Sequence, residues 1–271
     1  MKLNKRQKII LDIEFAVIIL VCALFLFKKS CSRREFSELN QTEQEQLQEP
    51  LTRSGSERLA WDYPVRPGME EWRQFTTGRQ RWEACQIPQN VIDALNTEEL
   101  AKICMDFPLF FEYAFSDDER MAINFMIENF NGLKELSKRK DGAMELINIY
   151  KTYPILTQIQ DEASKDYHTP YKLPFLELLL SDNAFIKQLD DRMFDELEKI
   201  VLEKYVGKLE NSHVYSLYNI NNTFLLGAVV IVNRNSAKTP AQQETARRFI
   251  DNYGRYDTEL LTEISRVISG L

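Results

Sequence analysis

The stretch NTFLLGAVVIVNRN (222–235) decides the fold, because its middle, residues 224–232, carries no charged or polar side chain. Valine and isoleucine dominate that middle, and such a composition suits a fully buried β-strand as well as a buried helix. The segments on both sides have helical spacing, and we therefore expect 222–235 to be a central buried helix. Its apolar middle is too short to cross a bilayer, so we do not expect a membrane span here.

Helical spacing of apolar residues recurs through most of the chain beyond residue 60, and Gly and Pro are scarce, with nine of each in 271 residues. Few Gly and Pro leave few hairpin turns, so the pattern predicts an all-α domain of packed helix pairs. Helix-start signals precede three segments: Asn96 before Glu99, Ser116 before Glu119, and Thr239 before Pro240. The spacing predicts helices over 97–106, 117–130, 143–150, 193–205, 241–250 and 260–268.

The predicted helix 117–130 carries a broad apolar face. Met121, Phe125 and Ile127 lie on it, and Met126 and Phe130 widen it. We expect a face of this width to be buried against the rest of the domain.

Two stretches look alike, FPLFFEYAFSDD (107–118) and LPFLELLLSDNAF (173–185). Each pattern predicts a proline that starts a short buried helix and a Ser-Asp pair that caps the next helix. The likeness fits an internal repeat of stacked helix pairs of the HEAT kind, and it also fits the repeated use of capping residues in any helical protein. We favour the second explanation.

The N-terminus reads as a membrane anchor. Residues 9–27 are apolar apart from Asp12 and Glu14, and a helix of this length spans about 28 Å, close to the hydrocarbon thickness. We predict an uncleaved signal-anchor in residues 1–34, with its tail in the cytoplasm and its C-terminal domain outside the inner membrane. The alternatives are a secreted protein, produced by leader cleavage, and a lipoprotein with a lipobox that ends at Cys31. Such a lipobox needs an apolar residue where Lys28 stands.

Charge separates the chain into two parts. Residues 1–34 contain eight Lys or Arg and two acids, a net charge of +6, and since the chain has −7, residues 35–271 carry −13. Such an acidic domain repels phosphate backbones, which excludes nucleic acid as a partner. Residues 35–60, rich in Glu, Gln, Ser and Thr, read as a flexible tether, and 61–271 as one helical domain with a candidate sub-boundary near 153–170.

The stretch WDYPVRPGMEEWRQF (61–75) joins the tether to the domain. Its two X-Pro steps predict an extended strap over 61–67, followed by a short helix. Trp61, Tyr63 and Trp72 either form an exposed aromatic contact for a carbohydrate or peptide, or pack as a lid onto the helices. We favour packing, since buried aromatic rings contribute most to core stability.

The strap and the stretches ACQIPQNVIDALNTEELAKICMDFPLF (84–110) and NFNGLKELSKRKDGAMELI (129–147) resemble a widespread group of exported or lipid-anchored α-helical proteins of Bacteroidetes. The resemblance covers about 61–153. It implies export and an α-helical fold, and it brings no activity and no catalytic residues. Lys28 and Lys29 depart from the cleaved or lipidated leaders typical of that group.

Cys85 and Cys104 are the cysteines beyond the leader. Cys85 ends an expected short helix, and Cys104 lies on the next long helix, which we expect to fold back after a brief connection. In an oxidising compartment the two sulfurs either form a disulfide or remain separate buried thiols, and we slightly favour the thiols.

Catalytic signatures are absent from the sequence: it has no GxSxG, HExxH or Walker A motif and only two histidines, His168 and His213. We therefore predict no catalytic, cofactor or metal residues, and a membrane-tethered helical module that binds an unknown protein or envelope partner. The alternative is a hydrolase of cell-envelope polymers with paired carboxylates. The candidate acids, Asp190-Asp191 and Asp117-Asp118-Glu119, stand where helices start, and capping accounts for them.

Overall fold

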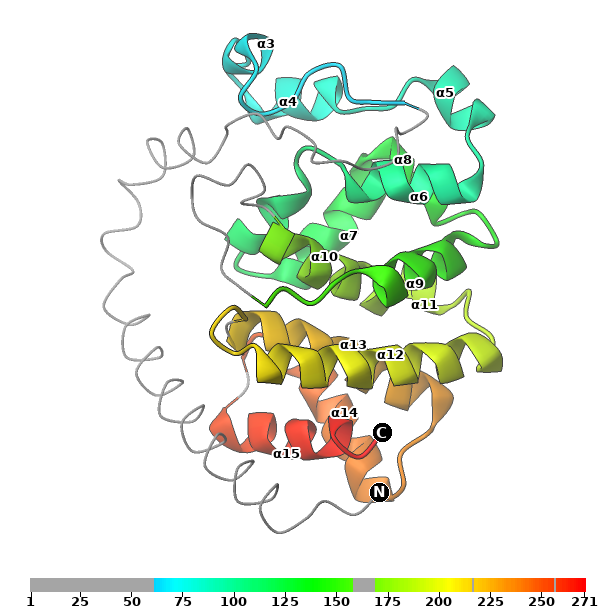
Figure 1. Ribbon diagram of the computed structural model, residues 1–271, viewed down its shortest axis with the longest axis vertical. Helices are drawn as coiled ribbons and strands as arrows, with labels where there is room; N and C mark the ends of the chain where they lie inside the picture. Colours follow the sequence, from blue (N-terminus) through cyan, green and yellow to red (C-terminus); the bar gives the residue numbers. More distant parts are fainter. Residues whose placement is uncertain (1–60, 158–168, 216, 256) are drawn as a thin grey trace, which may run out of the picture. The chain divides into compact units, whose positions relative to one another are not determined.

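The computed structural model describes residues 61–157, 169–215, 217–255 and 257–271 (Figure 1). Within these residues all regular structure is helical, which confirms the all-α prediction for this part of the chain. The predicted anchor and tether, 1–60, lie outside the described residues. No helix in the described part is both long and apolar enough to span a membrane.

The elements follow one another in a fixed order along the chain. They are α3 (Glu70–Arg73), α4 (Gly78–Ala84), α5 (Gln89–Ala94), α6 (Thr97–Met105), the 3₁₀-helix η1 (Phe110–Phe115), α7 (Glu119–Asn129), α8 (Asn131–Leu136), α9 (Gly142–Thr152), α10 (Thr169–Ser181), α11 (Asn183–Ile186), α12 (Asp191–Glu210), α13 (Leu217–Arg234), α14 (Pro240–Asp251) and α15 (Thr258–Ile268). The described residues up to 255, together with Leu260–Leu271, belong to one compact unit.

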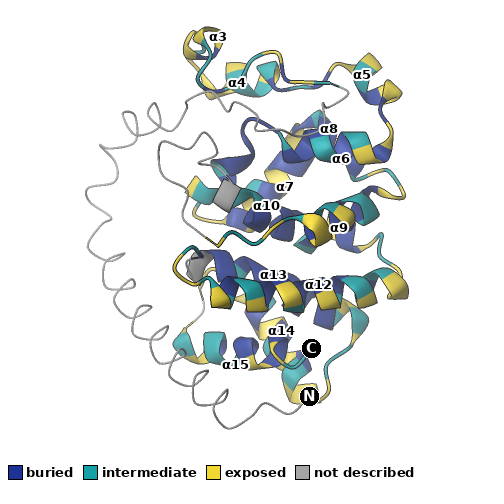
Figure 2. Ribbon diagram, in the orientation of Figure 1, coloured by how far each residue is buried: buried dark blue, intermediate teal, exposed yellow. Residues whose placement is uncertain are grey.

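Helix α13 lies at the centre of the C-terminal helices, as its apolar middle predicts. It packs against α10, α12 and α14, and its middle is buried (Figure 2). Gly227 permits close packing here, because a Cβ at this position would lie 2.4 Å from Cδ1 of Ile268. The helix closes at Asn235, whose positive φ of 55° accompanies a hydrogen bond from Ser236 N to Ile231 O. The prediction of a buried helix, not a strand, is confirmed.

The N-terminal helices are short and are held together by side chains that bond to backbone. Asn131 donates from Nδ2 to Ile87 O at 2.7 Å and accepts from Ile87 N at 2.9 Å. Arg139 donates to Leu95 O and Ile92 O at 2.8 and 3.0 Å, and so satisfies carbonyl groups at the end of α5. Asn131 and Arg139 thus join the segments around α4, α5 and α8.

Two of the three predicted helix starts are confirmed. Asn96 and Glu99 form a capping box at α6, and Thr239 caps α14 ahead of its proline. The third was wrong by two residues: Asp118, not Ser116, caps α7, by accepting from Met121 N at 3.0 Å. The Ser116 hydroxyl instead bonds to the backbone N–H and C=O of Asp118, a local bond typical of short polar side chains before a helix.

The two similar stretches adopt different structures. The first forms the 3₁₀-helix η1 after its proline. The second has residues 173–181 in α10, with Pro174 inside the helix, and then enters α11. The prediction that each proline starts a helix is therefore wrong for Pro174. Asp182 does cap the next helix, by accepting from Ala184 N at 2.8 Å.

Candidate functional site

The strap aromatics are packed onto the helices. The side chains of Tyr63 and Trp72 are only 3% and 1% exposed. Trp61 is partly buried, and its ring makes an edge-to-face contact with that of Tyr63. The Tyr63 hydroxyl donates to Ile103 O at 3.1 Å, and its ring lies 6.5 Å from that of Phe107. This burial contradicts an exposed aromatic contact at Tyr63 and Trp72. It is favourable because it removes a large apolar area from water.

Charged side chains fasten the same strap. Arg66 donates to Asp62 and to Asp106 at 2.5 Å each, and its guanidinium lies 5.2 Å from the centre of the Tyr63 ring. Lys172 of α10 reaches Asp106 from the other side at 3.4 Å. Burial acts to lower the pKa of Arg66, yet its two carboxylate partners more than offset this and raise that pKa. These contacts make the strap part of the domain.

Cys85 and Cys104 are both free and buried, so the structure contains no disulfide between them. Helix α6, which carries Cys104, packs on α8 and α9. Burial raises the pKa of Cys85 to about 12 and also raises that of Cys104. Both thiols are therefore protonated at neutral pH and behave as small apolar side chains.

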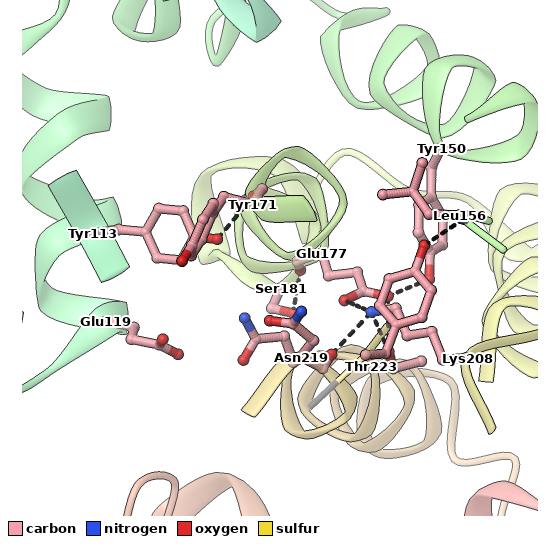
Figure 3. A network of polar contacts seen from close by, with 12 residues as sticks. Tyr113, Glu119, Tyr150, Leu156, Tyr171, Glu177, Ser181, Lys208, Asn219 and Thr223 are labelled. Atoms are coloured by element: carbon pink, nitrogen blue, oxygen red, sulfur yellow. Dashed lines mark hydrogen bonds and ion pairs between the residues drawn. The ribbon is translucent and has the colours of Figure 1, made fainter. Parts of the chain in front are cut away.

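A fully buried ion pair lies among α9, α10, α12 and α13 (Figure 3). Lys208 Nζ donates to Glu177 Oε2 at 2.7 Å, to Asn219 O at 2.9 Å and to Thr223 Oγ1 at 2.9 Å. The other oxygen of Glu177 accepts from Thr223 Oγ1 at 2.8 Å and from Tyr150 Oη at 2.9 Å. Every N–H of the ammonium and both carboxylate oxygens therefore have partners.

This network is built for structure, since Glu177 and Lys208 have no exposed surface. Burial lowers the pKa of Lys208, and Glu177 opposes that shift as the neighbouring negative charge. A substrate could not reach either group without opening the core. Sequence reasoning missed the pair; the available signal was that Lys208 follows the buried positions Leu197, Val201 and Tyr205 on α12 at helical spacing.

The carboxylates of the hydrolase alternative have structural partners. Asp118 and Asp190 cap α7 and α12, which confirms the capping interpretation for these two acids. Glu119 is 7% exposed and accepts from the Tyr253 hydroxyl at 2.5 Å. The same hydroxyl also contacts the side chain of Asn222 on α13. Of the candidate acids, Asp118, Glu119 and Asp190 therefore have partners within the structure.

Metal and histidine chemistry find no support in the described residues. No group of three or more His, Cys, Asp or Glu side chains there is arranged to hold a metal ion. His213 is exposed, and its Nε2 lies 3.0 Å from Thr157 O, while His168 lies outside the described residues.

Helix α7 presents an exposed stripe, which we call the α7 stripe and define as Asp118, Met121, Phe125 and Glu128. Spacings of four and three residues put Met121, Phe125 and Glu128 on one face of the helix, and Asp118 is the N-cap that precedes it. Met121 is 70% exposed and Phe125 51%. The prediction that Met121 and Phe125 are buried was therefore wrong: the buried face of α7 is Ile123, Met126 and Ile127, followed by Phe130.

The Phe125 ring is held in place from one side. It meets the partly buried Trp82 edge to face, with ring centres 5.3 Å apart, and Trp82 in turn packs on Phe107 at 5.4 Å. Trp82 also donates a hydrogen bond to Glu112. Burial raises the pKa of Glu112, and this bond and the charge of Arg81 offset only part of that rise. The stripe thus has a firm aromatic support.

Comparison of the chain with protein-family models, with curated proteins and with solved structures finds no match. Function therefore has to be inferred from the residues of this chain. Of its two distinctive features, the ion pair of Glu177 and Lys208 is inaccessible, whereas the α7 stripe faces solvent. The stripe is the candidate functional site.

Proposed function

We propose that this chain is a membrane-tethered protein that binds a partner protein through the α7 stripe. In this proposal residues 9–27 anchor the chain in the inner membrane, residues 35–60 form a tether, and the helical domain lies outside the cytoplasm. The apolar leader with its basic flanks supports the anchor, and the family resemblance over 61–153 supports export.

The observation that carries the binding role is the exposure of Met121 and Phe125, which are 70% and 51% accessible. Fully burying a Met or Phe side chain stabilises by about 1.5–3 kcal/mol, so covering the exposed parts of these two contributes about 2–3 kcal/mol. That free energy corresponds to roughly a hundredfold in affinity. Aromatic side chains held in a packed setting are also typical of binding hot spots.

Site-specific photo-cross-linking in the native membrane tests this function. A benzophenone amino acid replaces Met121 in the full-length protein, and the matched control replaces Val206, an apolar residue of α12 that is 44% exposed. We expect a discrete protein adduct from position 121 and none from position 206. Adducts with lipid alone, or equal adducts from both positions, would contradict the binding role.

Fractionation tests the tether independently. We expect the full-length protein to stay in the membrane fraction through carbonate and high-salt washes, because its attachment is hydrophobic. A mature N-terminus beginning after residue 27 would refute the anchor and leave the binding role of α7 untouched.

A further inference from the structure

Exposed apolar side chains concentrate in one part of the described chain. Of its four exposed large hydrophobic residues, Phe115, Met121 and Phe125 lie within eleven consecutive positions, and Val206 lies on α12. Resting on the proposed function, we propose that the α7 stripe binds an amphipathic helix of another protein. That helix carries two apolar side chains one turn apart, with Lys or Arg at both ends.

The apolar centre of the stripe fits a helix. Met121 and Phe125 are four residues apart, which places them about 6 Å apart along the axis of α7. Side chains at i and i+4, or at i and i+3, of a partner helix have nearly the same separation, as in other cases where an amphipathic helix lies on an apolar surface. Phe125 is fixed against Trp82. Met121 is flexible and adapts to the shape of its partner.

The charges at the ends of the stripe define the chemistry of the partner. Asp118 lies three residues before Met121 and Glu128 three residues after Phe125, and both acids are exposed. They are about 15 Å apart along the axis. Arg120, the basic residue of α7, donates to Ile250 O at 2.9 Å. A bound helix therefore meets negative charge at each end of its apolar face, which Lys or Arg complements.

Other occupants fit this surface less well. A second copy of α7, packed antiparallel, would bring Asp118 against Glu128, and like charges repel. An anionic lipid surface is repelled for the same reason. Residues 35–60 of the chain itself contain six Glu and two Arg, so they have the same sign of charge as the stripe. The complementary occupant is a basic helix.

A pair of synthetic peptides tests the charge requirement. Both are 16-residue helices with leucines one turn apart; one has lysines at its ends and the other glutamates. Binding to full-length protein in phosphatidylcholine nanodiscs is measured by fluorescence anisotropy, with empty nanodiscs subtracted. We expect the lysine peptide to bind at least tenfold more tightly than the glutamate peptide, and to weaken as NaCl rises from 50 to 300 mM.

Variants link that preference to the stripe. Phe125→Ser is expected to weaken binding of the lysine peptide at least tenfold. Val206→Ser, the matched exposed control, is expected to leave that binding unchanged. Asp118→Asn with Glu128→Gln is expected to remove the preference without unfolding α7, since Asn is as good a helix cap as Asp. Equal binding of the two peptides, or a preference that survives the double substitution, would overturn the inference.

The two proposals can fail separately. A protein adduct from position 121 in cells, combined with equal binding of both peptides, keeps the proposed function and refutes a basic partner. If the protein prefers the lysine peptide through the α7 stripe but position 121 gives no protein adduct in cells, the inferred binding of a basic helix is supported and the proposed function is refuted. A cross-link from position 121 to residues 1–34 of the same chain overturns the proposal of a separate partner.

Discussion

The buried ion pair makes a strong prediction about stability. Lys208→Met removes the ammonium that donates to Glu177 Oε2, Asn219 O and Thr223 Oγ1, and leaves the Glu177 carboxylate charged in the core. Breaking a buried pair from one side costs about 3–5 kcal/mol, because the remaining charge is desolvated and unpaired. Out of a total stability of about 5–15 kcal/mol, such a loss is large and still measurable.

The double variant identifies the cause. In Glu177→Gln with Lys208→Met, the Gln carbonyl oxygen still accepts from Tyr150 and Thr223, and neither of the two positions carries a charge. We expect this pair of changes to cost about 0–2 kcal/mol, far less than the sum of the two single changes. The coupling between the two sites should therefore reach at least about 3 kcal/mol.

Urea unfolding of the full-length protein, followed by circular dichroism at 222 nm, measures these differences. Lys199→Met, at an exposed position on the same helix, is the control and should change stability by less than about 0.5 kcal/mol. The reasoning is refuted if Lys208→Met costs no more than the control. It is also refuted if the double variant costs as much as the two single changes together.

Three further predictions follow from other sites. Gly142→Ala should destabilise by about 2 kcal/mol or more, because its Cβ would lie 2.2 Å from a backbone carbonyl oxygen, whereas Gly78→Ala, at the start of α4, has open space and should not destabilise; urea unfolding compares the pair. Burial raises the pKa of Glu112, so the folded state binds that proton more tightly and stability falls as pH rises above about 4.3; Glu112→Gln should remove this loss, with the greatest gain at pH 7 and none below pH 4 in pH-dependent unfolding. Cys85 and Cys104 should resist iodoacetamide in the native protein and both react in unreduced urea, by mass spectrometry; a bridged pair would react in neither.

Local sequence signals predicted where the helices lie. They failed to predict which face of a helix is buried. Capping chemistry located α6 and α14, because a cap depends on residues within one turn. Apolar residues lie on more than one face of α7, and Met121 and Phe125 were assigned to the buried face although they are exposed. The acid Glu128, on the same face as these two residues, indicated that this face reaches solvent.

The buried pair could not be predicted in the same way. A lysine at a core position of α12 signals that some acceptor lies nearby, but Glu177 is 31 residues away and Thr223 lies on a third helix. Which acid meets Lys208 is set by how α10, α12 and α13 pack, and sequence spacing within one helix holds no information about that. The cysteines illustrate the same limit, since spacing along the chain left both a disulfide and two separate thiols open, and the structure has the thiols.

Polar residues in the first half of α13 explain why this apolar helix has one packing. Asn219 O and Thr223 Oγ1 both accept from Lys208, and the Asn222 side chain contacts the Tyr253 hydroxyl, so polar groups of α13 meet partners from two other parts of the chain. Apolar contacts alone tolerate a helix that slides by a turn, since one aliphatic side chain replaces another at little cost. The same slide here would separate Thr223 from both Lys208 and Glu177 and leave buried polar groups without partners, at about 1–3 kcal/mol for each neutral group and more for each charge. The network therefore fixes the register of α13 against α10 and α12, whatever its net contribution to stability.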